Sequence, residues 1–298
     1  MIGLPTGETR PQSARSGAAA DESSLAGLVR RHDRDRFQTA LFAPAQEREA
    51  LFALYAFNYE VARVREAVSE PMLGQIRLQW WREVVSAAFS GEAPRYHIVA
   101  EPLTGVIREF RLSRHCFERL IDARERDLDP EPPASLAALQ NYADGSSASL
   151  VLLALEVLGA HQPETQELGR AVGIGYALAG LIRAMPFHAA DKRCYIPADL
   201  AAGSGLKIED YEARRTTSAL RAAVGEIAAA ARRHLSQARA QRAAIPRRAI
   251  AAVLPALIAK RFLRRLERVG YDPFEPGLAL PDPMQSWRLA AAALLNRF

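Results

Sequence analysis

LFALYAF, residues 51–57, forms the centre of a long apolar segment. Large apolar residues recur there at steps of three and four, from Leu51 to Val64. That spacing gathers them on one side of an α-helix. It predicts one long helix over residues 45–70, which Pro71 ends or kinks because proline lacks the amide hydrogen that a helix interior needs.

The same reasoning predicts helices along the rest of the chain, with no internal repeat. A first helix opens at Ser24 and is followed by a break over residues 33–44. Ser135 is a natural N-cap for the helix that contains Tyr142. Further helices are expected over residues 72–89, 98–110, 114–128, 146–158, 166–184 (closed by Pro186), 216–242 and 247–269, with a short last helix around Trp287.

Composition agrees with a single all-α domain. The chain has 298 residues, 49% of them apolar, which is enough for a large core. Ala, Leu and Arg dominate, which favours helix over sheet. We expect one helical domain over residues 23–298, preceded by a disordered tail over residues 1–22 that lacks the apolar centre of a secretory signal. No apolar run reaches the roughly 18 residues of a membrane span.

Cysteine usage and the distribution of charge limit the cellular environments and partners that suit the protein. Cys116 and Cys194 lie far apart without a metal-binding or disulfide pattern, which favours a reduced, cytoplasmic environment. Of the 39 basic residues only three are Lys, which we interpret as the codon bias of a GC-rich bacterium. Residues 214–268 carry fourteen basic residues against two acids, whereas the whole chain has a net charge of +5.

Such an asymmetry indicates contact with an anionic surface, namely phospholipid, nucleic acid or an acidic protein. A solvated helix face is the alternative. Nucleic acid is the least favoured partner, because no aromatic stacking platform or helix-turn-helix punctuation accompanies the charge.

Several motifs, in order and spacing, resemble the squalene/phytoene synthase family. They are the ALYAF lead-in at residues 53–57, the entry motif at residues 37–44 with Arg48, and Asp127 and Tyr142 further on. The resemblance covers about residues 37–197 and is weaker in the last third. It implies the all-α fold of the isoprenoid (terpenoid) synthases as a single large helical domain.

Active members of that family ionise an allylic diphosphate with magnesium. Two facing helices supply the carboxylates, because hard cations must neutralise the leaving group. In the first motif, D-D-x-x-D, this chain has Ala62 and Arg63 at the leading acid positions and Glu66 at the trailing one. Arg63 and Arg65 would repel magnesium.

The second motif has also lost its acids. Aligned on Arg183 and on residues 195–197, the family positions Q-x-x-N-x-x-x-D-x-x-x-D hold Ala177, Gly180, Ala184 and His188. Glu66 alone cannot hold a metal cluster. The sequence therefore predicts no catalytic residue, no metal ligand and no cofactor, with magnesium needed only if the chain is an active prenyl transferase.

The arginines of this region admit two interpretations. Guanidinium groups could bind a phosphate-bearing lipid or prenyl chain without metal. The candidates for such a site are Arg48, Arg63, Arg65, Arg183 and Tyr195. Alternatively, Arg63, Arg65 and Arg183 form ion pairs with Glu60, Glu66 or Asp127. A lone histidine such as His188 is usually structural.

Longer strings, such as DARE at residues 122–125 and RAMPFH at residues 183–188, resemble a divergent branch of the family. That branch includes an assembly factor of mitochondrial respiratory complex I. It implies a pseudoenzyme that helps to build NADH:quinone oxidoreductase, with complex I subunits or assembly intermediates as partners. We expect peripheral association with the bacterial inner membrane. The alternatives are a head-to-head prenyl transferase with an altered metal site and an isoprenoid or lipid carrier.

Overall fold

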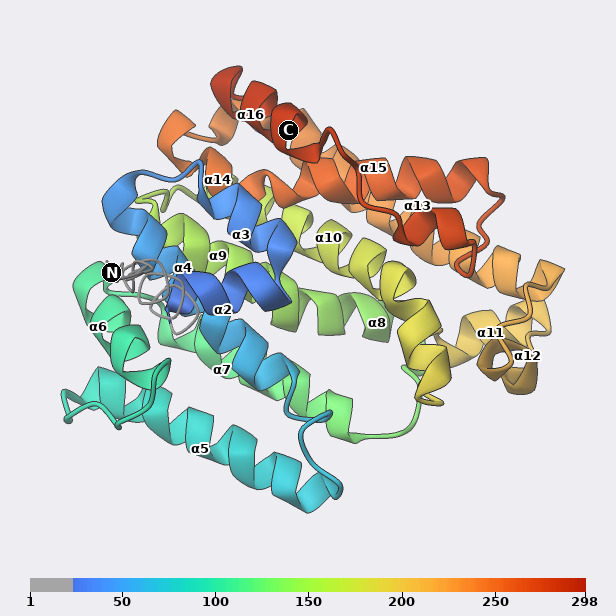
Figure 1. Ribbon diagram of the computed structural model, residues 1–298, viewed down its shortest axis with the longest axis horizontal. Helices are drawn as coiled ribbons and strands as arrows, with labels where there is room; N and C mark the ends of the chain where they lie inside the picture. The colour runs from blue at the N-terminus through green and yellow to red at the C-terminus, as the bar shows by residue number, and fades with distance from the viewer. Residues whose placement is uncertain (1–23) are drawn as a thin grey trace, which may run out of the picture.

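The computed structural model of the chain describes residues 24–298, and every regular element in that range is helical (Figure 1). The all-α prediction is confirmed. The expected disordered tail, residues 1–22, lies outside the described residues.

The helices follow one another with short connections. The first half holds α2 (Leu25–His32), α3 (Arg34–Ala40), α4 (Ala45–Ala62), α5 (Pro71–Ser90), α6 (Ala100–Phe110), α7 (Arg114–Glu125), the 3₁₀ turn η1 (Arg126–Leu128), α8 (Leu136–Ala143), the π-helical turn η2 (Asp144–Ala148) and α9 (Ser149–Val157). The second half holds α10 (Pro163–Ala190), α11 (Ala198–Ser204), α12 (Ile208–Glu212), α13 (Ser218–Ala240), η3 (Arg242–Ala244), η4 (Arg247–Ala249), α14 (Ile250–Val253), α15 (Pro255–Arg268), η5 (Pro276–Ala279) and α16 (Gln285–Leu294).

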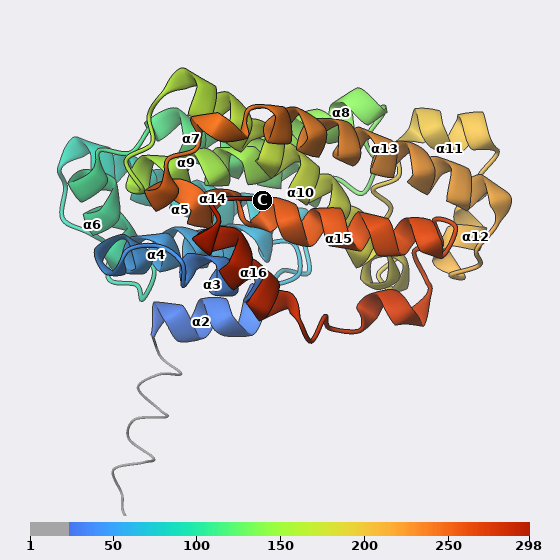
Figure 2. The same ribbon diagram turned by 90° about the horizontal axis from the view of Figure 1, so that it is seen from above.

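Helix α10 lies in the middle of the bundle (Figures 1 and 2). On one side it packs against the continuous rod of α8, η2 and α9, and on the other against α13 and α15. Helix α4 packs against α2, α6 and α9, while α5 packs against α6 and α7 at the far edge of the bundle. Fourteen of the 28 residues of α10 are buried, so α10 joins the two halves of one core.

Glycine permits the close approach of α10 to its neighbours. A Cβ atom at Gly173 would lie 2.3 Å from the Cα atom of Ala148 in η2, and one at Gly175 would lie 2.7 Å from the Leu235 side chain on α13. The same approach buries Asp144 of η2, whose carboxylate accepts hydrogen bonds from Arg119 and Arg170. The close contact between α10 and η2 therefore goes together with a buried Asp144 carboxylate that is paired with two arginines.

The first long helix is shorter than predicted. Helix α4 ends at Ala62, and a turn follows in which Arg63 caps the helix and Glu66 is exposed. Pro71 is the first residue of α5 rather than the end of the preceding helix. Proline suits that position because the first turn of a helix has no use for its missing amide hydrogen.

Three other boundaries differ from the predictions. Residues 33–44 contain α3, for which the Asp33 carboxylate is the N-cap and accepts from the Arg36 amide at 3.1 Å. Helix α10 continues through Pro186 to Ala190, because packing along its length outweighs the one hydrogen bond that proline removes. The predicted helix 247–269 is divided into η4, α14 and α15, the last of which begins at Pro255.

Arginine side chains hold the irregular segment between α15 and α16. Arg221 of α13 donates to the carbonyls of Val269 and Gly270, at 3.0 and 2.7 Å. Arg265 donates to the carbonyls of Leu280, at 3.1 Å, and Gly277. The segment is therefore tied to the bundle through its backbone oxygen atoms.

One described helix, α10, is long and apolar enough to cross a bilayer by length and composition alone. Of its most apolar window, 67% is buried inside the protein. That burial is what a core helix requires, and it agrees with the packing of α10 on both sides.

Replacing Gly173 by Ala should destabilise the fold, because the new methyl group would collide with main-chain atoms of η2 that cannot move independently. The expected loss is about 1–3 kcal/mol of unfolding free energy, measured by urea denaturation. Gly180→Ala in the same helix is the matched control, since no atom lies within 4 Å of its Cβ position. That change should stabilise the helix by up to about 1 kcal/mol. Equal effects at both positions would contradict the proposed close packing.

Candidate functional site

A single buried carboxylate organises the region between α7, α8 and the end of α10. Asp127, which is 6% exposed, accepts hydrogen bonds from the hydroxyl groups of Tyr195 at 2.6 Å and Tyr142 at 3.1 Å. Arg124 and Arg193 reach the same carboxylate at 3.3 and 3.4 Å. Two guanidinium groups around one carboxylate leave the cluster with an excess of positive charge.

The environment of this cluster fixes the protonation of its aromatic members. Burial, together with the negative charge of Asp127, raises the pKa of Tyr195 far above its usual value, so the phenol stays protonated and can donate. The His188 ring packs on Tyr195 with 4.8 Å between centroids. Burial and the nearby charge of Arg193 lower the pKa of His188 to about 4. Its imidazole is therefore neutral near pH 7.

The first degenerate motif lies at the end of α4 and offers no acid cluster. Ala62 is the last residue of the helix, and Glu66 lies exposed in the turn that follows. The Arg63 guanidinium donates to the Tyr59 hydroxyl at 3.2 Å and lies 3.5 Å from the Glu60 carboxylate. Arg63 therefore makes an intramolecular ion pair, with one of the three acids that the sequence offered as partners.

The second degenerate motif forms one stripe along α10, since its members are three, four and four residues apart. The stripe consists of Ala177, Gly180, Ala184 and His188, all of them half-buried. No atom lies within 4 Å of the Cβ position of Gly180, so the stripe borders open space there. Its side chains end in methyl groups, a hydrogen atom and one imidazole.

These donors do not fit a magnesium cluster. Magnesium in proteins prefers carboxylate and water oxygen atoms in an octahedral arrangement, and a guanidinium stands at one of the leading acid positions. Within residues 24–298 there is no group of three or more His, Cys, Asp or Glu side chains that could hold a metal ion. The residues present on the two helices thus lack the chemistry that metal-assisted diphosphate ionisation requires.

The candidate anion-binding residues do not gather in one place. Arg48 donates to the Ala43 carbonyl at 3.2 Å, and Arg65 is exposed in the turn after α4. Tyr195 belongs to the Asp127 cluster. Arg183 binds the Asp35 carboxylate on α3 at 2.7 Å, so its partner is none of the three acids predicted.

Sequence reasoning missed the residues that α3 contributes, because this short helix was predicted to be a break. Arg36 is buried, pairs with Asp33 at 2.7 Å and lies over the ring of Tyr176 at 5.0 Å. Asp35 accepts from Arg183 of α10 and from Gln285 of α16. The capping pattern at Asp33 was the available signal for this helix.

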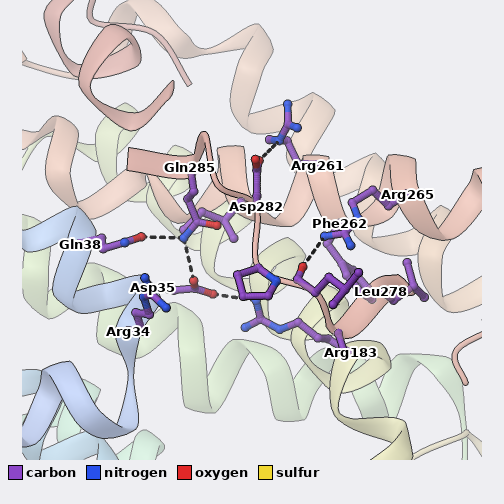
Figure 3. A pocket seen from close by; sticks show the side chains of 14 residues that line it. Arg34, Asp35, Gln38, Arg183, Arg261, Phe262, Arg265, Leu278, Asp282 and Gln285 are labelled. Atoms are coloured by element: carbon purple, nitrogen blue, oxygen red, sulfur yellow. Dashed lines mark hydrogen bonds and ion pairs between the residues drawn. The ribbon is translucent and has the colours of Figure 1, made fainter. Parts of the chain in front are cut away.

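A pocket of about 230 Å³, with both charged and apolar lining residues, lies beside Arg183 (Figure 3). It opens between α3, α10, α15 and the segment that leads into α16. Its charged lining residues are Arg34, Asp35, Arg183, Arg261, Arg265 and Asp282. Four guanidinium groups against two carboxylates make this pocket suited to an anion.

Comparison with known proteins places this geometry in a family. The sequence profile of "Squalene/phytoene synthase" matches residues 29–290. Complex I assembly factor 6 (NADH dehydrogenase, ubiquinone) of Homo sapiens is 30% identical over 93% of this chain and 87% of its own length. The Rattus norvegicus protein of the same name is 31% identical, over 94% and 86%. Presqualene diphosphate synthase of Rhodopseudomonas palustris is 27% identical, over 86% and 89%.

Solved structures agree on the fold. A dehydrosqualene synthase superposes with a TM-score of 0.80 at 15% identity, covering 94% of this chain and 97% of that one. A squalene synthase from Alicyclobacillus acidocaldarius superposes with a TM-score of 0.75 at 24% identity, covering 89% and 98%. The predicted isoprenoid synthase fold and the resemblance to the assembly-factor branch are both confirmed.

Replacing Asp127 by Asn should destabilise the protein by up to about 3 kcal/mol, because the half-buried Arg124 and Arg193 would lose their counter-charge. Tyr195→Phe removes one hydrogen bond to the same carboxylate and should cost about 1 kcal/mol. Asp122→Asn is the control, since that exposed carboxylate pairs with Arg82 at the surface and should contribute no more than about 1 kcal/mol. Chemical denaturation measures all three, and a small effect at Asp127 would contradict its structural role.

His188 should make the fold sensitive to acid. The pKa of His188 is about 4 in the folded chain, whereas an unperturbed histidine, as in the unfolded chain, has a pKa of about 6.5. The unfolded chain therefore binds the proton more readily. Stability is therefore lost as the pH falls from about 6.5 to about 4. His188→Gln should remove up to about 3 kcal/mol of that loss. Unfolding free energies of the two proteins across this range test the expectation, and parallel curves would disprove it.

Proposed function

Because the chain belongs to the squalene/phytoene synthase family, we propose that it is a non-catalytic member of it. It assists the assembly of NADH:quinone oxidoreductase, respiratory complex I, instead of joining two prenyl chains. Its partners are complex I subunits or assembly intermediates, and nucleic acid is not among them. The role needs no cofactor.

The observation that carries this proposal is the absence of carboxylates from the leading positions of one motif and from every position of the other, on two separate helices. Ala62 and Arg63 end α4 without a carboxylate, and the α10 stripe from Ala177 to His188 has none. An ionising diphosphate needs cations on both sides of the site. A change on one helix could be compensated by the other, whereas a change on both removes the cluster.

The relatives support the same function. Two mammalian complex I assembly factors reach 30% and 31% identity over 93% and 94% of the chain. The presqualene diphosphate synthase of Rhodopseudomonas palustris reaches 27% over 86%. The similarity to assembly factors is thus both greater and longer.

The proposed place of action is the cytoplasmic face of the bacterial inner membrane, with peripheral attachment. Residues 214–268, with fourteen basic residues against two acids, support this placement, because anionic headgroups attract basic segments close to a membrane surface. These residues form α13, α14 and α15, which lie together along one side of the bundle (Figure 1).

A second candidate function is an isoprenoid or lipid carrier, and the pocket in Figure 3 favours it. Arg183 is the one predicted anion-binding residue that lines this pocket, together with Arg34, Arg261 and Arg265. Guanidinium groups bind phosphate oxygen atoms directly. Retention of a prenyl diphosphate without magnesium would support this candidate, which is compatible with an assembly role.

Diphosphate release from farnesyl or geranylgeranyl diphosphate, in the presence of magnesium and NADPH, tests the absence of catalysis. We expect no release by the wild-type protein above the enzyme-free rate. The Ala62→Asp/Ala184→Asp variant, which returns one acid to each helix, is assayed alongside, so that the wild type is compared with a chain that has an acid at one motif position of each helix. Robust magnesium-dependent release by the wild type would contradict the proposal and identify a prenyl transferase.

A deletion strain tests the assembly role directly. Native gels should show a loss of assembled NADH:quinone oxidoreductase that the full chain restores, with succinate:quinone oxidoreductase as the unaffected control complex. Normal amounts of the assembled complex in the deletion strain would rule out the role.

A further inference from the structure

The last helix carries an apolar stripe that faces away from the protein. In α16 and its two capping residues, four apolar positions follow one another at steps of three, four and three, and a fifth lies four residues after the third, so all five share one face. The stripe consists of Met284, Trp287, Ala291, Leu294 and Leu295, all exposed. Trp287 is 73% exposed, Leu294 70% and Leu295 63%, which is unusual for side chains of this size.

The opposite face of α16 is fixed to the bundle. Leu289 is fully buried and lies about 180° around the helix from the middle of the stripe. The Gln285 amide donates to Asp35 at 3.1 Å and to Gln38 at 2.7 Å, and Asp35 is held in turn by Arg183 of α10. Helix α16 cannot turn its apolar stripe inward without breaking these contacts.

The surroundings of the stripe are positively charged. Asp282, just before α16, is shared by Arg261 and Arg288, at 2.8 and 2.6 Å. Among the contacts within residues 24–298, the Arg265 guanidinium donates to backbone carbonyl oxygens, which do not neutralise its charge. Arg34 is exposed at the start of α3, and Arg297 is exposed beyond α16.

The apolar and the charged parts meet at one edge of the molecule. Leu280, which is 65% exposed, lines the same pocket as Arg34 and Arg265 (Figure 3). Helix α16 and the segment that leads to it run along this edge, with α2 on the same side (Figure 2). A flat anionic surface could therefore contact the stripe and the arginines at the same time.

We propose that this edge is the membrane-docking surface of the protein. The stripe of α16, with Leu280, enters the interfacial region of an anionic phospholipid leaflet, while Arg34, Arg297 and the shared pair around Asp282 lie among the headgroups. Tryptophan favours that depth because its ring is apolar and its N–H is polar. This inference rests on the proposed function, whose membrane contact it assigns to a defined helix.

Charge complementarity selects a lipid surface over a second copy of the chain. A two-fold dimer through this edge would bring two positive patches together. Anionic headgroups neutralise the patch instead. An apolar stripe and a basic rim also supply the two signals that stable yet reversible peripheral binding requires.

Sedimentation of the purified full chain with vesicles tests the docking surface. Vesicles that contain phosphatidylglycerol should bind the protein, and pure phosphatidylcholine vesicles should bind it much less. Trp287→Glu and Leu294→Glu should each lower the partition coefficient about tenfold or more. Arg34→Glu should weaken binding and reduce its dependence on salt.

The matched control is Ile76→Glu, because Ile76 is 60% exposed on α5, at the opposite edge of the bundle from α16 (Figure 1). Its binding should equal that of the wild type, and thermal melting should show that all variants fold. Tryptophan fluorescence gives a second measure of insertion. Its emission should shift to shorter wavelength when the protein binds vesicles, and Trp287→Phe should abolish that shift.

Three outcomes would overturn the proposal. The first is unchanged vesicle binding by Trp287→Glu and Leu294→Glu, and the second is an equal loss of binding by Ile76→Glu. The third is a dimer that Trp287→Glu dissociates, without vesicle binding by the wild type. Because the vesicles contain no complex I, a failure here leaves the deletion-strain result intact, and a normal deletion strain leaves vesicle binding intact.

Discussion

The close contact between α10 and the π-helical turn is the constraint on which the rest of the bundle depends. Gly173 brings the two backbones together, and Gly175 does the same for α10 and α13. With its neighbours so near, α10 can bury apolar side chains on both sides and unite the core. The contact also removes Asp144 from solvent, so Arg119 and Arg170 must supply its counter-charge.

Buried and half-buried carboxylates with arginine partners recur through the structure. Asp127 lies between Arg124 and Arg193, Asp33 pairs with the buried Arg36, and Asp35 binds Arg183. Arginine suits these positions because its planar group donates to several acceptors and loses its charge only at very high pH. Asp35 and Asp127 thus connect separate elements of the bundle, whereas the residues of the α10 stripe carry no charge near pH 7.

The sequence allowed the fold class to be predicted because the apolar spacing around residues 51–57 is helical and strong. The helix ends were harder, since proline occurs both inside a helix, at Pro186, and at its first residue, at Pro71 and Pro255. The loss of acids could be read from single positions. The partner of Arg183 could not, because Asp35 lies 148 residues away and on a helix that the periodicity did not reveal.

The arginine bonds to the segment between α15 and α16 have a consequence for hydrogen exchange. Arg221 and Arg265 hold this segment by its carbonyl groups, and several of its amides bond only to acceptors two or three residues away, as at Phe274 and Met284. Exchange depends on the bonds that each amide itself makes. The segment would therefore exchange quickly although its backbone is fixed in place, and rapid deuterium uptake there would be no measure of mobility.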